Sequence, residues 1–451
     1  MIGYYFRLAI ASFRRTPGLT ALMVAAIAVG IGVCVMAMTI YHSMSSNPIW
    51  WKNDQLYSVT LDNWSPNEPA DKKRPSLPPP QLTFRDAEAI LRSDIPKHTV
   101  IMYKSAGIVS GEGPRGPIAP INTRTRVTTG DFFPMFDVPF LYGGGWDRRA
   151  DMGPEPVMVV SAELNRKLFG GIDSVGRTVR WNDREFRIVG VMDDWNPMPK
   201  FYDVNNDPFE ETEHVFVPWS WGKTLNLLSY GNTNCWKPDD FSSFETFLNS
   251  ECVWVQGWVE LPDPATRERM QSFLDTYVAN ERRAGRFERP NNNRLTDVAQ
   301  WLKDQEVVES DNRVLVGLSF AFLTVCLINT VGLLLAKFLN AASISGVRRA
   351  LGASRRDLFV QHMVEVGVVA AVGALAGLGL GALGLKGFRQ LYEYTQTGVL
   401  NRAGGLQALA HIDGTSVSIA IALAVVATFA AGIYPAWRIG RIHPGTYLKN
   451  Q

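Results

Sequence analysis

Residues 171–178 nearly match the G-x-x-x-x-G-K-[ST] motif of a phosphate-binding loop. In such a loop, glycines let backbone N–H groups approach a phosphate, and a lysine reaches the outer phosphate oxygens. Here Arg177 stands where the lysine belongs, and strand-like residues follow it, whereas a true loop of this kind opens a helix. We interpret the segment as a turn that leads into a strand, not as a nucleotide site.

A second glycine pattern, at residues 379–384, has the G-x-G-x-x-G spacing of dinucleotide-binding proteins. It lies inside an uncharged apolar stretch that contains no strand-to-helix turn. Gly373, Gly377 and Gly381 repeat there every four residues, on one face of a helix. Small residues at this spacing let two membrane helices approach closely. We therefore predict helix packing rather than cofactor binding.

The residue types that most often carry catalysis are scattered. The sequence has no H-E-x-x-H pair and no G-x-S-x-G turn. Carboxylates such as Asp193 and Asp194 lie in an acidic part of the chain, where we expect them to be solvated. The six histidines are spread along the whole chain: His42, His98, His214, His362, His411 and His443. We predict no catalytic residue and no metal site.

The four cysteines divide into two pairs. Cys34 and Cys326 fall in apolar stretches and are expected to pack as small residues. Cys235 and Cys252 fall in a more polar region, which would be oxidising if it lies in a bacterial periplasm. The spacing alone does not show whether their Cα atoms come close enough to be bridged. Cys235 and Cys252 remain a candidate disulfide.

The average composition of the 451 residues resembles that of a soluble protein. The chain is 46% hydrophobic and 20% charged, with a net charge of +2 and a mean hydropathy of −0.03. These values exclude a long disordered chain and a strongly basic nucleic-acid binder, and four cysteines are too few for a disulfide scaffold. The average, however, hides a strong segregation of apolar and charged residues.

Four stretches without any charged residue are long enough to cross a bilayer as helices: residues 19–40, 314–336, 366–385 and 414–437. The first could instead be a signal peptide, because Arg14 and Arg15 precede it. Its apolar run is longer than a signal core, however, and no A-x-A cleavage site follows. We predict a retained anchor and four membrane spans.

Charge sets the orientation of these spans. The N-terminal segment and the C-terminal tail carry arginine and lysine without acid, and the connection after the second span is also basic. Positive charge concentrates on the cytoplasmic side of membrane proteins, so we expect both termini to be cytoplasmic. The long region between the first two spans is net acidic and is expected to be exported.

The predicted fold class is an α-helical membrane protein with four transmembrane helices (1+3) and a large mixed α+β extracytoplasmic domain. The expected order is a cytoplasmic segment, span one, the periplasmic domain, span two, a cytoplasmic loop, span three, a periplasmic loop, span four and a cytoplasmic tail. The corresponding boundaries are 1–18, 19–43, 44–312, 313–337, 338–362, 363–386, 387–413, 414–437 and 438–451.

Local patterns predict several elements of the exported domain. Strands are expected at 55–61, 157–161 and 252–260, a hairpin at 177–191 around Asn182 and Asp183, and helices at 83–92, 162–169 and 264–281. Apolar residues from Leu295 to Val308 suggest a last helix that runs without a break into the second span. Such a rod would carry motion between the domain and the membrane, or serve as a tether only.

The spans contain little polar chemistry. Asn329 is their most polar residue, and Glu365 borders the third span. Proton-coupled transport needs ionisable groups at membrane depth, so this pattern argues against a secondary transporter. The chain shows no energy source of its own.

Three features together resemble the MacB/FtsX family of ABC-transporter permeases. The first is the layout of one span, a large exported domain and three further spans. The second is the exported sequence from Thr129 to Phe133, the glycines before Trp146, and the segments 156–161, 164–170, 175–177 and 186–191, which look like a MacB-type periplasmic core domain. The third is cytoplasmic, with residues 346–353 followed by Gln361 and Glu365, and residues 434–438 at the exit of the last span.

The resemblance implies a short coupling helix that docks on a cytosolic ATPase. That role passes to Gly346, Val347, Arg348, Arg349, Ala350, Leu351, Gly352 and Ala353. The alternative is a plain positively charged anchor. Ile344 stands where the family often has glutamate, which leaves open a specialised ATPase or an asymmetric role in a heterodimer.

The same resemblance implies the partners. With 18 residues before Leu19 and no true phosphate loop, we expect ATP and Mg on a separate ABC ATPase dimer, and no cofactor on this chain. A second permease, identical or paralogous, is implied, together with membrane lipids, a periplasmic adaptor and an outer-membrane channel, and no nucleic acid. The expected protein is a non-catalytic subunit in the bacterial inner membrane that drives efflux or lipoprotein and peptide export by mechanotransmission. The alternative is an FtsX-like protein that regulates an exported enzyme.

Overall fold

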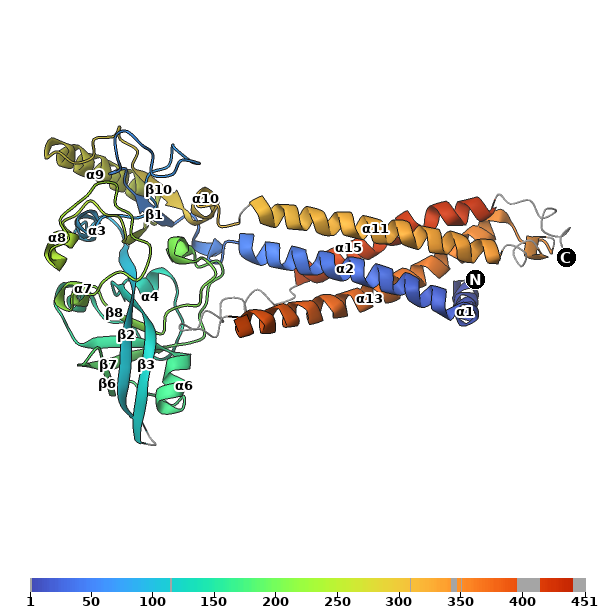
Figure 1. The fold of residues 1–451 in the computed structure, drawn as a ribbon, viewed down its shortest axis with the longest axis horizontal. Coiled ribbons are helices and arrows are strands. Elements are labelled where there is room, and N and C mark those ends of the chain that lie inside the picture. Colours follow the sequence, from blue (N-terminus) through green and yellow to red (C-terminus); the bar gives the residue numbers. More distant parts are fainter. Residues whose placement is uncertain are drawn as a thin grey trace. The chain divides into compact units, whose positions relative to one another are not determined.

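The computed structural model describes residues 2–113, 116–308, 310–341, 347–349, 351–395 and 414–440. The chain is divided into two compact units (Figure 1). The helical unit comprises Met1–Met44, Glu309–Gly398 and Leu406–Gln451, and the sheet domain comprises Ser45–Val308 and Val399–Gly405. The large insertion after the first span is therefore a folded domain of its own.

The helical unit contains the long apolar helices. The described elements are α1 (Ile2–Arg15), α2 (Pro17–Ser45), α11 (Ser310–Asn340), α13 (Arg355–Thr395) and α15 (Gly414–Gly440). Within the described part of the chain, four segments are long and apolar enough to cross a membrane: Pro17–Lys52, Arg313–Asn340, Arg355–Gly387 and Ile421–Arg438. The prediction of four candidate membrane helices is confirmed, and each predicted span overlaps one of these segments. The short helix α1, which ends one residue before α2, was not predicted.

The helical unit has a core of its own. Ile27 and Ile31 of α2 pack with Leu334 of α11, Val366 of α13 and Ala431 of α15. Many large apolar side chains of the same helices point outward, among them Leu318, Ile328, Leu375 and Leu383. Exposed apolar side chains all along a helix are typical of lipid or partner contact.

The sheet domain is built on one ten-stranded sheet. Its order is β10-β1-β9-β2-β3-β8-β5-β7-β4, with β6 paired to both β2 and β7. Pairing is antiparallel except for the parallel pairs β3–β8 and β5–β7. The strands are β1 (Leu56–Thr60), β2 (His98–Gly113), β3 (Gly116–Thr128), β4 (Phe140–Gly143), β5 (Val157–Ser161), β6 (Thr178–Trp181), β7 (Arg184–Met192), β8 (Val215–Pro218), β9 (Gln256–Glu260) and β10 (Arg294–Asp297).

Both faces of the sheet are covered. In β5, Met158 and Val160 join one hydrophobic cluster, whereas Val157 and Val159 join the other. Successive side chains of a strand point to opposite faces, so the two clusters lie on opposite sides of the sheet. The helices α3, α6 and α9 contribute to the first cluster, and α4, α5 and α10 to the second.

Several of the domain's helices begin at a residue whose side chain caps the first turn. The Thr83 hydroxyl accepts from the Asp86 N–H at the start of α3, and Ser161 accepts from the Leu164 N–H at the start of α6. These contacts satisfy N–H groups that the first helical turn leaves unpaired. The helices and 3-10 segments of the domain are η1 (Trp50–Lys52), α3 (Phe84–Leu91), α4 (Phe132–Met135), α5 (Arg148–Met152), α6 (Ala162–Phe169), η2 (Phe201–Asn206), α7 (Ser220–Thr224), α8 (Phe244–Leu248), α9 (Pro264–Arg283) and α10 (Val298–Asp304).

The predicted hairpin is confirmed. β6 and β7 are joined by Asn182 and Asp183, which both adopt positive φ, at 46° and 62°. Asparagine and aspartate tolerate this left-handed conformation best after glycine. The near-miss motif that precedes the hairpin leads into strand β6 as expected, and Gly176 there has a φ of 86°.

Two expectations about elements are wrong. The strand expected at 252–260 begins only at Gln256, because Val253 and Val255 form isolated bridges with Asn234 and Leu82. The continuous rod into the second span is interrupted. Its first residue, Leu295, belongs to β10, α10 ends at Asp304, and Glu306 adopts a φ of 48°, which no helix continues through.

Candidate functional site

The predicted coupling segment lies between α11 and α13. Gly346 and Ala350 fall outside the described residues, and Val347–Arg349 are helical. Val347 is 49% exposed and Leu351 is 82% exposed, and Gly352 turns the chain at a φ of 103°. The segment therefore presents apolar side chains outward at a turn between two long helices.

Two contacts fix this segment on the first turns of α13. One terminal nitrogen of Arg348 donates to Oε1 of Gln361 at 2.7 Å. The Ser354 hydroxyl accepts from the Asp357 N–H at 3.2 Å, and the Ser354 N–H donates to the Asp357 carboxylate at 3.1 Å. This reciprocal arrangement is that of a capping box. It defines where α13 starts, at Arg355 directly after the capping residue Ser354.

A buried polar group, here called the Lys337 cluster, lies near the same helix ends. It consists of Ser12, Phe13, Lys337, His362 and Glu365. The Lys337 ammonium lies 2.6 Å from Oε1 of Glu365, and both side chains are less than 5% exposed. Ser12 donates to the same oxygen at 2.6 Å. The Lys337 ammonium also lies 4.7 Å from the centre of the Phe13 ring.

The Lys337 cluster joins three helices that are remote in sequence. Ser12 and Phe13 come from α1, Lys337 from the last turns of α11, and Glu365 from α13. His362, one turn before Glu365, packs its ring 4.1 Å from that of Phe338. The sequence placed Glu365 only at a span border. The sequence held one indication of this pair, because Lys337 directly follows the second apolar stretch and Glu365 directly precedes the third. That pattern alone did not show that the two side chains contact each other.

The glycine stripe of α13 lies directly against α2. A Cβ added at Gly373 would lie 2.7 Å from Cγ2 of Ile27, and one at Gly377 would lie 2.9 Å from the Ala28 carbonyl oxygen. At Gly381 the nearest atom is the Gly32 carbonyl oxygen, at 3.3 Å. The first two distances leave no room for a side chain. The three glycines thus do what their spacing indicated.

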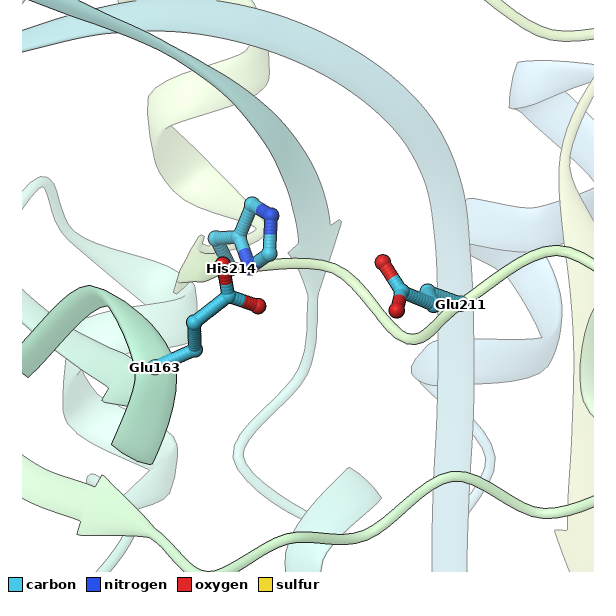
Figure 2. A group of neighbouring side chains, drawn as sticks. All are labelled: Glu163, Glu211 and His214. Carbon is cyan, nitrogen blue, oxygen red and sulfur yellow. The ribbon is translucent and has the colours of Figure 1, made fainter. Parts of the chain in front are cut away.

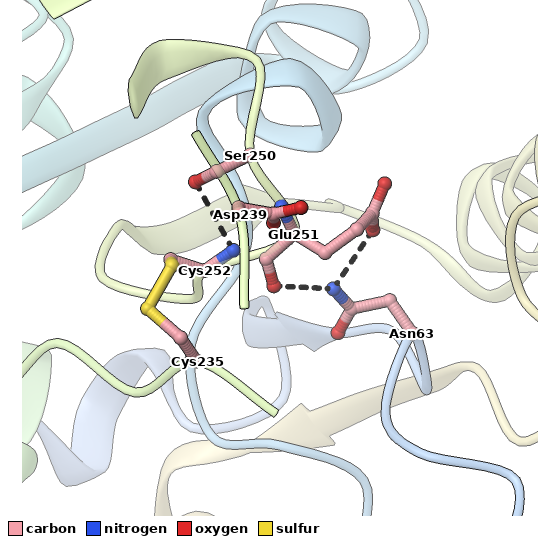
Figure 3. Close-up of a disulfide and its surroundings, with 6 residues drawn as sticks. All are labelled: Asn63, Cys235, Asp239, Ser250, Glu251 and Cys252. Atoms are coloured by element: carbon pink, nitrogen blue, oxygen red, sulfur yellow. Dashed lines mark hydrogen bonds between the residues drawn. A yellow bond between two sulfur atoms is a disulfide. The ribbon is translucent and has the colours of Figure 1, made fainter. Parts of the chain in front are cut away.

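The cysteines of the sheet domain form a disulfide, Cys235–Cys252 (Figure 3). Next to it, the Glu251 N–H donates to Asp239 at 2.8 Å, and the Asn63 amide donates to the Glu251 carboxylate at 3.3 Å. Glu251 also pairs with Arg286, at 2.5 Å. The bridge therefore fastens a long surface segment beside a buried ion pair.

A second buried group, the Arg126 cluster, lies inside the sheet domain. It consists of Arg126, Lys200, Asp203 and Glu213, all less than 2% exposed. Arg126 lies 2.6 Å from Asp203 and also pairs with Glu213, and Lys200 lies 3.0 Å from Glu213. Although burial opposes ionisation, the two cations hold the pKa of Glu213 well below its usual range.

Three possible metal donors meet at the edge of the same domain (Figure 2). One ligand atom each of Glu163, Glu211 and His214 lies within 4.8 Å of the other two. Burial, and after it the Arg124 guanidinium, lower the pKa of His214 to about 4, and burial raises the pKa of Glu211. The imidazole is therefore neutral near pH 7. The sequence did not suggest this group, because Glu163 is remote in sequence from Glu211 and His214.

A groove of about 790 Å³ opens beside α3 and α9. Its walls carry aromatic side chains such as Trp219 and Tyr277 together with charges of both signs. The charges largely pair with one another, as in Arg85–Glu281 at 3.4 Å and Arg92–Glu88 at 3.5 Å. The lining therefore selects no particular class of ligand.

Four candidate membrane helices among the described residues, and an inserted α/β domain that forms a compact unit of its own, define a protein of the membrane-anchored class. Residues 20–276 match the MacB-like periplasmic core domain, and residues 316–444 match the FtsX-like permease C-terminal model. The chain belongs to this family of ABC-transporter permeases.

Named relatives agree with this membership. The chain is 24% identical over 441 residues to a macrolide export ATP-binding/permease protein MacB of Nitrobacter winogradskyi, covering 97% of this chain and 59% of that protein. A MacB of Chlorobium luteolum is 24% identical over 390 residues, covering 82% and 48%. The chain thus spans about half the length of these relatives.

Among solved structures, the periplasmic region of MacB from Actinobacillus actinomycetemcomitans is similar at 12% identity, with a TM-score of 0.33. The match covers 57% of this chain and 91% of that one. A similarity this low says nothing further about the fold.

Proposed function

We propose that this chain is the permease subunit of an ATP-driven transporter of the MacB/FtsX type. A separate ATPase dimer, which binds ATP and Mg, drives it. The chain itself performs no catalysis. It converts ATPase movements into a change of the exported domain, for efflux or for export of a lipoprotein or peptide. Its spans lie in the bacterial inner membrane with both termini cytoplasmic, which the basic helix ends support.

One observation carries the proposal: the exposed coupling segment rests on a helix that is clamped to two others. Arg348 ties the segment to Gln361 on α13. One turn further along α13, Glu365 is held by Lys337 of α11 and Ser12 of α1. A force applied to Leu351 therefore acts on three helices together, which suits mechanotransmission better than a channel.

The partners follow from the same surfaces. An exposed Val347 and Leu351 offer an apolar contact to an ATPase, with basic residues beside them. Outward apolar side chains on the spans suit a second permease and lipid. The relatives' names join ATP-binding and permease functions, which supports an ATPase as the driver. A periplasmic adaptor and an outer-membrane channel are part of the proposal for the efflux case.

The test is copurification from native membranes in mild detergent. Wild-type chain should bring down a protein with ATP-binding motifs. Leu351→Ala and Arg348→Glu should each reduce its yield several-fold, because both disturb the coupling segment. Leu375→Ala is the matched control, since Leu375 is 71% exposed on the same helix α13 but lies within the span. Unchanged ATPase yield with both coupling variants would refute the assignment, and capture of an exported hydrolase instead would favour regulation over transport.

A further inference from the structure

Glu163, Glu211 and His214 come from two parts of the sheet domain that are distant in sequence. Glu163 lies in the first turn of α6, Glu211 lies in the segment before β8, and His214 directly precedes β8. The Ser161 N–H donates to the His214 carbonyl at 2.9 Å, so the pairing of β5 and β8 places the start of α6 beside the histidine. Figure 2 shows the Glu163 carboxylate beside the His214 ring and the Glu211 carboxylate turned toward both.

Each of the three side chains is held by a neighbouring residue through one of its two polar atoms. The other polar atom is available as a metal ligand. Ser161 Oγ lies 3.3 Å from Nδ1 of His214, Lys167 lies 2.6 Å from Oε1 of Glu163, and Arg124 lies 2.9 Å from Oε2 of Glu211. Nε2 of the histidine and the second oxygen of each carboxylate take no part in these bonds. Partners that orient metal ligands in this way are typical of metal sites.

We propose that Glu163, Glu211 and His214 form a zinc-binding site with one imidazole and two carboxylate ligands. Zinc holds nitrogen and oxygen ligands at about 2.0–2.2 Å, which puts neighbouring tetrahedral ligands ~3.3 Å apart. The donors here lie within 4.8 Å of one another, so small side-chain movements would bring them to that spacing. Glu163 is 39% exposed, so the site is open to solvent and leaves a position for water.

The charges around the site decide its affinity. Lys167 lies one turn after Glu163 on α6 and is 45% exposed, so this solvent-exposed pair adds little to stability. A divalent cation can displace the lysine without breaking the fold. Arg124, in contrast, is 5% exposed and shared between Glu210 and Glu211, and it stays in place. Bound zinc would join α6 to the segment that precedes β8.

The test uses the full chain in detergent, stripped with a chelator and titrated with zinc chloride against a chromophoric competitor. Wild type should bind one more zinc ion per chain than His214→Asn, and Glu163→Gln should bind zinc roughly tenfold more weakly or worse. His98→Asn is the matched control, because His98 also faces a carboxylate of the same domain, that of Asp131 at 3.2 Å. The control should bind as wild type does.

Lys167→Met gives the proposal a test of opposite sign. Removing the competing ammonium should tighten zinc binding by roughly two- to tenfold. Circular dichroism in chelator shows whether each variant is folded, and the exposed Glu163→Gln serves if His214→Asn is not. Zinc binding that is absent from wild type, or unaffected by both ligand substitutions, would overturn the proposal, as would weaker binding by Lys167→Met.

Discussion

The sheet domain and the helical unit both bury ionised side chains, but they pair them differently. In the Arg126 cluster, two cations and two carboxylates neutralise one another within a single domain core. In the Lys337 cluster, one lysine and one glutamate join separate long helices, with Ser12 bringing in a third. The first arrangement lets the core of one domain bury ionised side chains, because each charge has a partner of opposite sign. The second arrangement ties separate helices to one another.

The largest effect is expected from Glu213→Gln. The substitution leaves Arg126 and Lys200 buried beside each other, with Asp203 near Arg126 and the more distant Glu210, 3.8 Å from Lys200, as counter-charges. Breaking a buried pair by removing one partner costs about 3–5 kcal/mol. We expect that loss in thermal or denaturant unfolding followed by tryptophan fluorescence. Glu185→Gln, at an exposed strand position, should change stability by less than about 0.5 kcal/mol.

Acid gives the same cluster an independent test. Since the pKa of Glu213 is lowered in the folded state, its ionised form contributes stability that is present above its unfolded pKa of ~4.3. That contribution is lost as pH falls below this value. The stability gap between wild type and Glu213→Gln should therefore narrow from pH 6 toward pH 3. A gap that stays constant would mean that the pairing with Arg126 contributes little.

The second effect concerns the Lys337 cluster. Glu365→Gln leaves the lysine buried without its carboxylate, and we expect a loss of about 3 kcal/mol in helical-unit stability. The same change weakens the contact between Ser12 and α13, because an amide oxygen accepts a weaker hydrogen bond than a carboxylate, so trypsin should cleave at Arg14 and Arg15 faster than in wild type. The double variant Lys337→Met with Glu365→Met should be less damaging than Glu365→Gln alone. Additive losses would show that the two residues act separately.

The sequence predicted what local rules control. Charge-free stretches located the spans, a threonine located the start of α3, and Asn182 with Asp183 located a hairpin. Each of these features depends on residues that lie close together in sequence, within a single helix, strand or turn.

The sequence failed where distant residues decide. The hairpin of β2 and β3 went unpredicted because its apolar alternation is broken by glycine, serine and arginine, and its register shifts between Val109 and Gly111. The expected helical rod was wrong because the apolar spacing from Leu295 onward comes from a strand, a short helix and a turn. Ser12 and Glu365 lie 353 positions apart, a separation that no local pattern resolves.

The third effect concerns the Cys235–Cys252 disulfide, and it compares the stability that this bond gives the sheet domain with that of its buried ion pairs. Cys235→Ala with Cys252→Ala removes a bridge that closes a loop of 17 residues. We expect a loss of about 2–3 kcal/mol, because the unfolded chain regains freedom. Reductant should destabilise wild type by the same amount and leave the double variant unchanged. An equal response of both proteins to reductant would show that the bridge does not contribute.

The smallest effect concerns packing without charge, and it shows whether the Lys337 cluster alone holds α13 in place. Gly377→Ala puts a methyl group 2.9 Å from the Ala28 carbonyl oxygen, whereas a Cβ at Gly379 meets nothing within 4 Å. Overpacking of this kind costs roughly 1–3 kcal/mol, so Gly377→Ala should lower the melting temperature of the detergent-solubilised chain. Gly379→Ala changes the same residue type two positions away and should be neutral or slightly stabilising, because alanine favours helix. If both variants melt alike, α2 and α13 do not depend on close contact, and the ion pair between Lys337 and Glu365 is the main tie of α13 to its neighbours.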